Sequence, residues 1–225
     1  MPGCAGNPFE DGALTKALII GLFLAGGALL LFAWLAEEVR EQDTRRFDER
    51  VRALVHRGAS PPLTRAMWCI SVVGSPAAMI VLSVAASVGF WRTGRARAAH
   101  LLLMTLAGAA LLHEVLKLSF RRTRPPPFFT YPEPASFSFP SGHALFSFCC
   151  LGMLALLVTP CLRQTAPRAM VWLGTVLLVG AIGFSRIYLG VHYPTDVLGG
   201  YLAAFIVVTA ITLGDHRYRR RRRQS

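Results

Sequence analysis

The chain has 225 residues, of which 53% are hydrophobic and 16% charged, whereas charged residues make up roughly 25% of an ordinary soluble domain. This composition argues against a soluble globular protein and predicts a membrane protein with a single domain over residues 1–225. The formal net charge is +12. Because the basic residues lie in short loops and a tail rather than on one soluble face, the charge argues against a nucleic-acid partner.

Six apolar segments are long enough to cross a bilayer, which requires about 20 apolar residues per helix. They comprise residues 14–35, 63–90, 98–120, 141–158, 169–189 and 194–213. Gly74, Ser75 and Pro76 predict a kink inside the second segment. The first segment is long and has no small-residue cleavage site after it, so we expect a retained helix rather than a signal peptide. The predicted fold is an all-α bundle of six transmembrane helices.

The distribution of arginine predicts the orientation of the bundle. Three regions are rich in arginine: residues 91–98, residues 160–168 with Arg163 and Arg168, and the tail 215–225 with five consecutive arginines. The positive-inside rule places such regions in the cytoplasm. We therefore expect both termini and the basic tail in the cytoplasm of a cell inner membrane, and residues 36–62, 121–140 and 190–193 on the outer side.

Two of the outer connections have unusual compositions. Residues 36–62 alternate acids and bases, which predicts a solvated helix whose charges compensate one another. Residues 121–140 contain Arg121, Arg122 and Arg124 against the positive-inside trend, and anion binding would explain them. The same loop is rich in proline and carries aromatic residues, which are typical anchors at headgroup depth. They are Phe128, Phe129, Tyr131, Phe137 and Phe139.

The cysteines predict neither a disulfide framework nor a zinc site. No C-x-x-C pair and no spacing of cysteine with histidine typical of a metal site occurs. We expect them to be small apolar residues of the helices. They are Cys4, Cys69, Cys149, Cys150 and Cys161.

Polar residues gather at four predicted helix ends on the outer side, where charged groups near hydrocarbon point to a function. Arginine offers a planar fork of donors that matches phosphate oxygens, lysine offers a point charge, and a helix N-terminus offers backbone N–H groups. A serine at the N-cap and a glycine after it let the backbone approach an anion. The predicted phosphate-binding residues are Lys117, Arg124, Ser141, Gly142 and Arg186.

Two histidines and an aspartate add the means to attack a bound phosphate. His192 and Asp196 are four residues apart, a spacing that puts both on one face of a helix, although Pro194 makes the first turn begin after His192. A carboxylate bonded to one ring nitrogen fixes the tautomer and leaves the other nitrogen free to attack. His143 then remains to protonate the leaving oxygen as general acid. These three residues are the predicted catalytic set.

The complete pattern resembles the three-part signature of the type 2 phosphatidic acid phosphatase family, which includes membrane lipid phosphatases and is related to vanadium haloperoxidases. The motifs match in residue type, spacing and order, and they cover residues 117–196, while the six-helix layout extends the resemblance to most of the chain. They are Lys117 with Arg124 and Pro125; Pro140, Ser141, Gly142 and His143; and Ser185 and Arg186 with His192 and Asp196.

The resemblance implies an enzyme that hydrolyses a lipid phosphate without a metal or other cofactor. It implies a phosphohistidine on His192, Asp196 as the residue that orients it, and His143 as acid and base. The five predicted phosphate-binding residues match the family's binding set. His113 and Glu114 lie outside the motifs, and we expect Glu114 to hold Lys117 or an arginine in place.

The expected partner is a lipid phosphate or diphosphate, and the oligomeric state stays open. Undecaprenyl diphosphate is favoured, because Arg121 or Arg122 would hold a second phosphate. The alternatives are phosphatidylglycerophosphate and phosphatidic acid. Two remote alternatives are a vanadate-dependent haloperoxidase and a non-catalytic lipid carrier.

Overall fold

The computed structural model describes residues 11–129 and 136–224, with side chains from Ile20 onward except those of residues 220, 223 and 224. Within these residues every regular element is a helix. The elements are α1 (Asp11–Glu41), α2 (Arg45–Arg57), α3 (Pro61–Val73), α4 (Pro76–Arg92), α5 (Ala96–Phe120), α6 (Gly142–Val158), the short 3₁₀ helix η1 (Thr159–Cys161), α7 (Thr165–Tyr188) and α8 (Pro194–Gln224). The predicted all-α class is confirmed.

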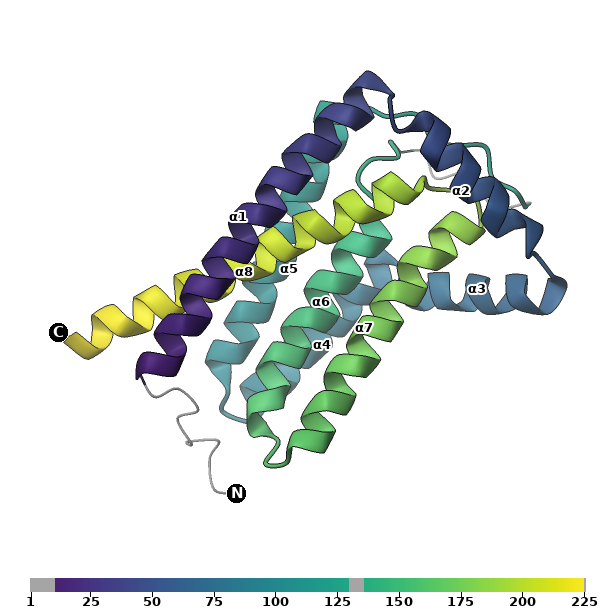
Figure 1. Ribbon diagram of the computed structural model, residues 1–225. Helices are drawn as coiled ribbons and strands as arrows, with labels where there is room; N and C mark the ends of the chain where they lie inside the picture. Colours follow the sequence, from purple (N-terminus) through teal and green to yellow (C-terminus); the bar gives the residue numbers. More distant parts are fainter. Residues whose placement is uncertain (1–10, 130–135, 225) are drawn as a thin grey trace.

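Helix α6 lies inside the bundle and contacts α5, α7 and α8 (Figure 1). Its small and apolar residues pack against α8 and α5 in the main core, where Leu145 and Met153 of α6, Leu102 of α5 and Ala204 of α8 are at most 1% exposed. Helix α1 packs along α8 on one side of the bundle. This packing brings the ends of α5, α6, α7 and α8 together.

The described residues contain five helices that are long and apolar enough to cross a membrane, and a sixth crossing if α3 and α4 form one span. The two helices are bent by 47° at a break, where Ser75 caps α4 by accepting a hydrogen bond from the backbone N–H of Ala78 (3.2 Å). Pro76 starts the new helix, as proline commonly does at the first position. The predicted kink is therefore present.

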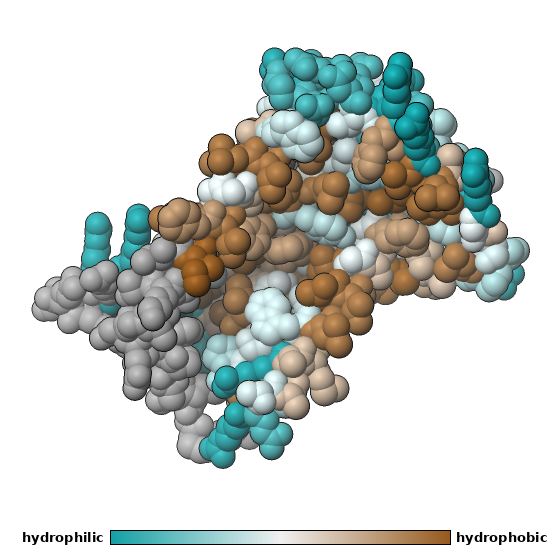
Figure 2. All heavy atoms as spheres, in the orientation of Figure 1, coloured by the Kyte–Doolittle hydropathy of each residue, from teal (hydrophilic) through white to brown (hydrophobic). Residues whose placement is uncertain are grey.

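Figure 2 shows an apolar band between hydrophilic ends. Many large apolar side chains of α1, α4 and α7 are exposed, among them Phe23 (78%), Val81 (68%) and Met170 (71%), as expected where lipid rather than water covers the surface. Polar residues inside the spans bond within their own helix: Ser83, Ser87 and Thr105 each donate to the carbonyl four residues earlier. Such bonds keep hydroxyl groups satisfied in hydrocarbon.

Helix α2 differs from the expected solvated helix. Its exposed face carries charges that compensate each other, such as Arg45 with Glu49. Its other face, however, buries Asp48 (0% exposed) and Arg52 (6%) against the connections between the spans. The expectation of a solvated helix with compensating charges is confirmed for the exposed face and wrong for the other, because alternation of charge in the sequence does not reveal which charges find buried partners.

Four cysteines lie in the described part of the chain, of which Cys69, Cys149 and Cys150 are free thiols. Cys149 and Cys150 are buried in α6, as expected for small apolar residues. Cys4 lies outside the described residues, as does Tyr131 of the aromatic loop.

Candidate active site

His192 lies between α7 and α8, and Asp196 lies in the first turn of α8. Nδ1 of His192 is 3.3 Å from Oδ2 of Asp196, and both side chains are buried. The same carboxylate oxygen accepts the backbone N–H of Tyr193 (2.8 Å), so an acid at the third helical position reaches back to the residue before the helix, as in a capping box. The capping turn explains why the four-residue spacing brings the two side chains together although the helix starts at Pro194.

The contacts of His192 determine its tautomer. On the other side of the ring, Nη1 of Arg124 lies 2.9 Å from Nε2. A guanidinium can only donate a hydrogen bond, and an ionised carboxylate can only accept one. Nδ1 therefore carries the proton and donates to Asp196, while Nε2 presents its lone pair to Arg124. Burial is the main cause that lowers the pKa of His192 from 6.5 to about 3, against the opposing effect of Asp196, so the ring is neutral at neutral pH.

Lys117 and Arg124 meet at a serine that the sequence analysis did not select. Nζ of Lys117 donates to Oγ of Ser136 (2.9 Å), and Nη2 of Arg124 donates to the same oxygen (3.0 Å). Arg124 also donates from Nε to the carbonyl of Ser136 (2.7 Å) and from Nη1 to the carbonyl of Val191 (3.0 Å). These bonds hold two cations beside His192. The only signal for Ser136 was its place shortly before the motif that begins at Pro140.

Ser141 occupies the N-cap of α6, as predicted, but its hydroxyl does not cap the helix. Oγ of Ser141 is buried without a hydrogen-bond partner among the described residues. Its backbone N–H donates to the carbonyl of Asp196 (2.9 Å), which joins the starts of α6 and α8. The hydroxyl thus remains available to an anion.

Gly142 faces the ring of His113. A Cβ added at position 142 would lie 2.8 Å from Nε2 of His113 and 3.5 Å from Pro76. Close packing at this helix start therefore requires glycine, which adds a second reason to the predicted approach of a ligand. Nδ1 of His113 lies 3.2 Å from Glu114, whose side chain is largely exposed. Among the described residues, Glu114 forms a hydrogen bond with His113, and not with Lys117 or an arginine as we had expected.

Arg186 and His143 complete the predicted set. Arg186 is 1% exposed and donates from Nη1 to Oγ of Ser71, close to the break between α3 and α4. His143 lies in the first turn of α6, within electrostatic range of Arg186, His192 and Arg124. The structure therefore brings all eight predicted residues to one end of the bundle, through contacts that link residues 117–196.

Arg122 has partners different from those expected. Its two terminal nitrogens contact Asp196 and Asp48, each at 2.7 Å. Because both carboxylates are buried, the guanidinium is held within the protein, which argues against Arg122 as the residue that holds a second phosphate. The sequence analysis missed Asp48 altogether, since it lies in a strongly charged helix where nothing distinguished it from its neighbours.

A family model described as the PAP2 superfamily matches residues 98–220. The chain belongs to the PAP2 superfamily. The match includes the eight predicted site residues together with Arg122 and Ser136, whereas Asp48, Ser71 and Pro76 lie outside it. Together with the helices long enough to span a membrane, it confirms the predicted helical membrane phosphatase.

Known members of the superfamily are similar over different lengths of the chain. Phosphatidylglycerophosphatase B of Bacillus subtilis is 28% identical over 196 residues, which cover 87% of this chain and 96% of the relative. An undecaprenyl-diphosphatase of Sulfolobus acidocaldarius is 36% identical over 106 residues, covering 45% of this chain and 47% of the relative. The crystal structure of a transmembrane PAP2-type phosphatidylglycerolphosphate phosphatase from Bacillus subtilis has a TM-score of 0.78 at 28% identity, covering 86% and 96% of the two chains. The prediction of a membrane lipid phosphatase is confirmed at this level.

Proposed function

We propose that this membrane phosphatase hydrolyses a lipid phosphate through a phosphohistidine at Nε2 of His192. The observation that carries the proposal is the pair of contacts on the His192 ring. Asp196 accepts the Nδ1 proton, and Nε2 keeps its lone pair towards the cationic side of the site. A neutral, oriented imidazole is the form that attacks phosphorus.

The reaction has two balanced steps. Nε2 of His192 forms a bond to phosphorus while the bond from phosphorus to the lipid oxygen breaks, and His143 donates a proton to the leaving oxygen. Water, deprotonated by His143, then attacks the phosphohistidine and releases inorganic phosphate. Lys117, Arg124 and Arg186 stabilise the negative charge that develops on the phosphoryl oxygens. The buried hydroxyl of Ser141 and the backbone N–H groups that begin α6 supply further donors.

Arg124 has to exchange partners when the phosphate binds. In this structure its Nη1 lies against the lone pair of Nε2 that the mechanism uses. A phosphate oxygen is a stronger acceptor for a guanidinium than a neutral imidazole. The phosphate therefore draws Arg124 away from the nitrogen and frees Nε2 at the moment when a substrate is present.

A lipid phosphomonoester such as phosphatidylglycerophosphate is the substrate class that the geometry favours. One cationic set surrounds Nε2, whereas Arg122, which would have contacted a second phosphate, is committed to Asp48 and Asp196. The relative that matches this chain over most of its length, phosphatidylglycerophosphatase B, supports the same choice.

A polyprenyl diphosphate, for which the sequence analysis named undecaprenyl diphosphate, is the second candidate. A cavity of about 250 Å³ lies next to the site and is lined by Arg40, Arg45, Arg121, Arg122, Phe120 and Tyr193, among others. Arg121 is exposed, and among the described residues its Nε donates to the carbonyl of Leu118. It remains the cation that would hold a second phosphate, and the similarity to an undecaprenyl-diphosphatase favours this option.

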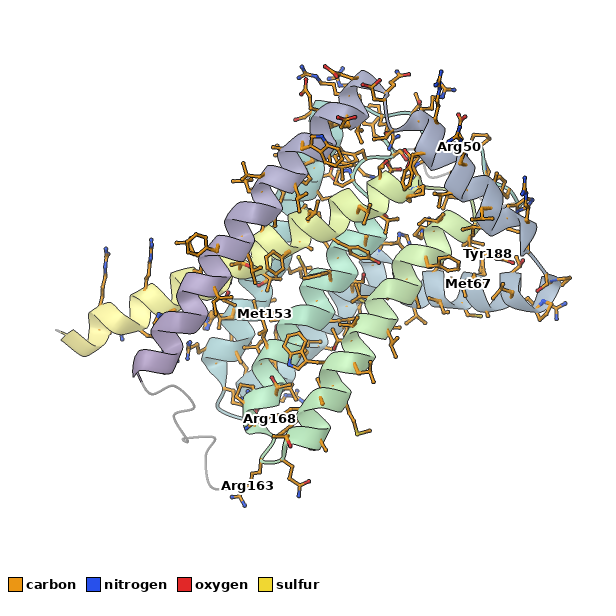
Figure 3. The ribbon with its side chains drawn as sticks, viewed as in Figure 1. Arg50, Met67, Met153, Arg163, Arg168 and Tyr188 are labelled. Carbon is orange, nitrogen blue, oxygen red and sulfur yellow. The ribbon has the colours of Figure 1, made fainter. Side chains whose placement is uncertain are left out.

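The distribution of charge supports a site on the outer face and termini in the cytoplasm. Arg163 and Arg168 lie at the end of the bundle opposite to Arg50 of α2 (Figure 3). The connection that carries the first two is rich in arginine without acids, as cytoplasmic loops are. With six crossings, the candidate site then faces the periplasm or the exterior. A cysteine-accessibility assay on Arg163→Cys and Arg50→Cys in intact cells tests this orientation; labelling of Arg163→Cys from outside would contradict it.

The decisive experiment measures phosphate release by the purified protein in detergent with EDTA present. The panel contains phosphatidylglycerophosphate, phosphatidic acid, undecaprenyl diphosphate and a water-soluble phosphate ester. We expect fastest release from phosphatidylglycerophosphate and none from the His192→Ala variant, which should still fold. Arg121→Ala should slow phosphate release from undecaprenyl diphosphate and not from the other substrates. Full activity of His192→Ala would overturn the mechanism, and bromide oxidation dependent on vanadate and peroxide would indicate the haloperoxidase alternative.

A further inference from the structure

Asp48 is the one residue of α2 that the structure buries completely. Its carboxylate accepts three hydrogen bonds: from Nη2 of Arg122 (2.7 Å), from the backbone N–H of Thr195 (3.1 Å) and from Oγ1 of Thr195 (2.7 Å). Thr195 directly precedes Asp196 at the start of α8. A helix on the surface of the bundle thus reaches the turn that carries the catalytic carboxylate.

Arg122 connects the two carboxylates with separate nitrogens. Nη1 donates to Oδ1 of Asp196 (2.7 Å) and to Oγ1 of Thr195 (2.8 Å), while Nη2 donates to Asp48 and, at 3.3 Å, to Oγ1 of Thr44. The guanidinium also stacks over the ring of Tyr193, 4.2 Å from its centroid. The rigid fork of an arginine suits this double contact, which the single ammonium of a lysine cannot make in the same geometry.

We propose that Asp48 and Arg122 are positioning residues that fix the orientation of Asp196, and through it the tautomer and orientation of His192. This proposal rests on the proposed function of His192 as the nucleophile. Both residues act outside the phosphate-binding set, and neither matches the motifs recognised in the sequence. They make α2 part of the active site.

The division of contacts on Asp196 explains how the arrangement works. Oδ1 of Asp196 is held by Arg122, and Oδ2 receives the side chains of His192 and Ser138 and the backbone N–H of Tyr193. With Oδ1 fixed, Oδ2 points at His192. Asp48 keeps one end of Arg122 away from Asp196; without it, the fork is free to take both carboxylate oxygens and to turn Oδ2 away from Nδ1 of His192.

Arg52 offers a control for a purely structural role of α2. It lies one turn from Asp48 and is also buried, and it donates from Nη2 to the carbonyls of Pro126 (2.7 Å) and Gly190 (3.0 Å). It therefore fastens α2 to the same connections, but it makes no hydrogen bond to Asp196 or Arg122. Loss of Arg52 tests attachment of the helix, and loss of Asp48 tests attachment together with orientation of Asp196.

The kinetic test compares Asp48→Asn and Arg122→Lys with Arg52→Lys and with Glu49→Gln, an exposed change next to Asp48. For the first two variants we expect kcat to fall by about tenfold or more, with KM and inhibition by inorganic phosphate within about twofold of the parent. Glu49→Gln should match the parent, and Arg52→Lys should lower the melting temperature with a smaller effect on kcat. Equal loss of kcat and of melting temperature in Asp48→Asn and Arg52→Lys would overturn the proposal.

A second test does not depend on activity. Nitrogen-15 NMR of histidine-labelled protein in micelles reports the tautomer of each ring, and the His192→Gln variant identifies the signals of His192. We expect the Nδ1–H form in the parent and in Arg52→Lys, and a mixture of tautomers in Asp48→Asn and Arg122→Lys. An unchanged tautomer in those two variants would refute the positioning role. The NMR result does not depend on whether any lipid on the panel is hydrolysed. Failure of the positioning role can therefore be distinguished from failure of the proposed function.

Discussion

Nη1 of Arg124 lies 2.9 Å from Nε2 of His192, so the cation expected to bind phosphate rests on the atom expected to attack it. The contact fixes the neutral tautomer before a substrate arrives. It also protects the lone pair of a buried ring from other partners, since the guanidinium can only donate. The proposed binding of phosphate and the proposed activation of His192 are therefore coupled through one side chain.

Replacing Arg124 by lysine tests whether activity needs the forked shape of the guanidinium or only its positive charge. Arg124→Lys keeps a cation but loses the fork that reaches Ser136, Val191 and His192 at once. We expect kcat/KM to fall by about 100-fold, equivalent to about 2.7 kcal/mol of transition-state stabilisation. Steady-state kinetics on the preferred lipid measures the loss. The matched control is Arg121→Lys at an exposed neighbour, and an equal loss in both variants would contradict a special role of Arg124.

Gly142 should tolerate alanine only when His113 is shortened. The new methyl group of Gly142→Ala would lie 2.8 Å from Nε2 of His113, so the start of α6 has to shift, and displacement of catalytic groups by about 1 Å costs roughly 100-fold in rate. The double variant with His113→Ala removes the collision and should recover much of the activity. Failure of the double variant to recover would mean that Gly142 is needed for the ligand alone.

The buried neutral His192 should make the protein less stable in mild acid. Burial lowers its folded-state pKa from 6.5 to about 3, so between these values the unfolded chain binds a proton that the folded chain does not. The contribution of neutral His192 to the free energy of unfolding is fully present above about pH 6.5 and is lost as the pH falls towards 3. Between pH 7 and pH 5 the loss is about 2 kcal/mol. The free energy of unfolding of His192→Gln, measured by denaturant titration in detergent, should fall correspondingly less between pH 7 and pH 5. Parallel pH profiles of parent and variant would contradict the assignment.

Arg121 should be replaceable by glycine with a gain in stability. It follows the last residue of α5 with φ of 45°, in the left-handed region, which costs a residue with a Cβ roughly 1 kcal/mol. Helices commonly end with glycine in this conformation. Arg121→Gly should therefore raise the free energy of unfolding by up to about 1 kcal/mol, measured beside Arg121→Ala, which keeps the strain. A gain shared by both variants would assign the effect to the lost charge.

Much of the fold followed from apolar length alone. The six expected segments correspond to the helices and to the bent pair, because bilayer thickness sets the number of apolar residues required. The ends were less predictable. Helix α1 continues to Glu41, six residues beyond the predicted segment, and α8 continues to Gln224, since good helix formers extend a helix into water after hydrophobicity has stopped.

The candidate site was likewise predictable in part. The eight predicted residues come together because short motifs place them at helix ends, and their roles in catalysis stay a prediction. Asp48 and Ser136 were missed because a partner of a charged group that is distant in sequence leaves no local pattern: Asp48 and Arg122 are 74 residues apart, and Lys117 and Ser136 are 19 apart. Arg122 looked like any arginine of an anion-binding loop, and only its two carboxylate partners distinguish it.

The break between α3 and α4 leaves no room for a side chain at Gly74, a residue outside the predicted catalytic set. A side chain at Gly74 would lie 2.4 Å from Ile182 of α7, and three residues earlier Ser71 accepts the hydrogen bond from the buried Arg186. Enlarging residue 74 would therefore push α3 away from α7 and withdraw a hydrogen-bond partner from Arg186, a predicted phosphate-binding residue. A genetic screen for lost activity should return Gly74 alongside His192, although Gly74 lies outside the predicted catalytic and phosphate-binding residues. Activity of this chain thus depends on close packing at the break between α3 and α4 as well as on the sequence motifs.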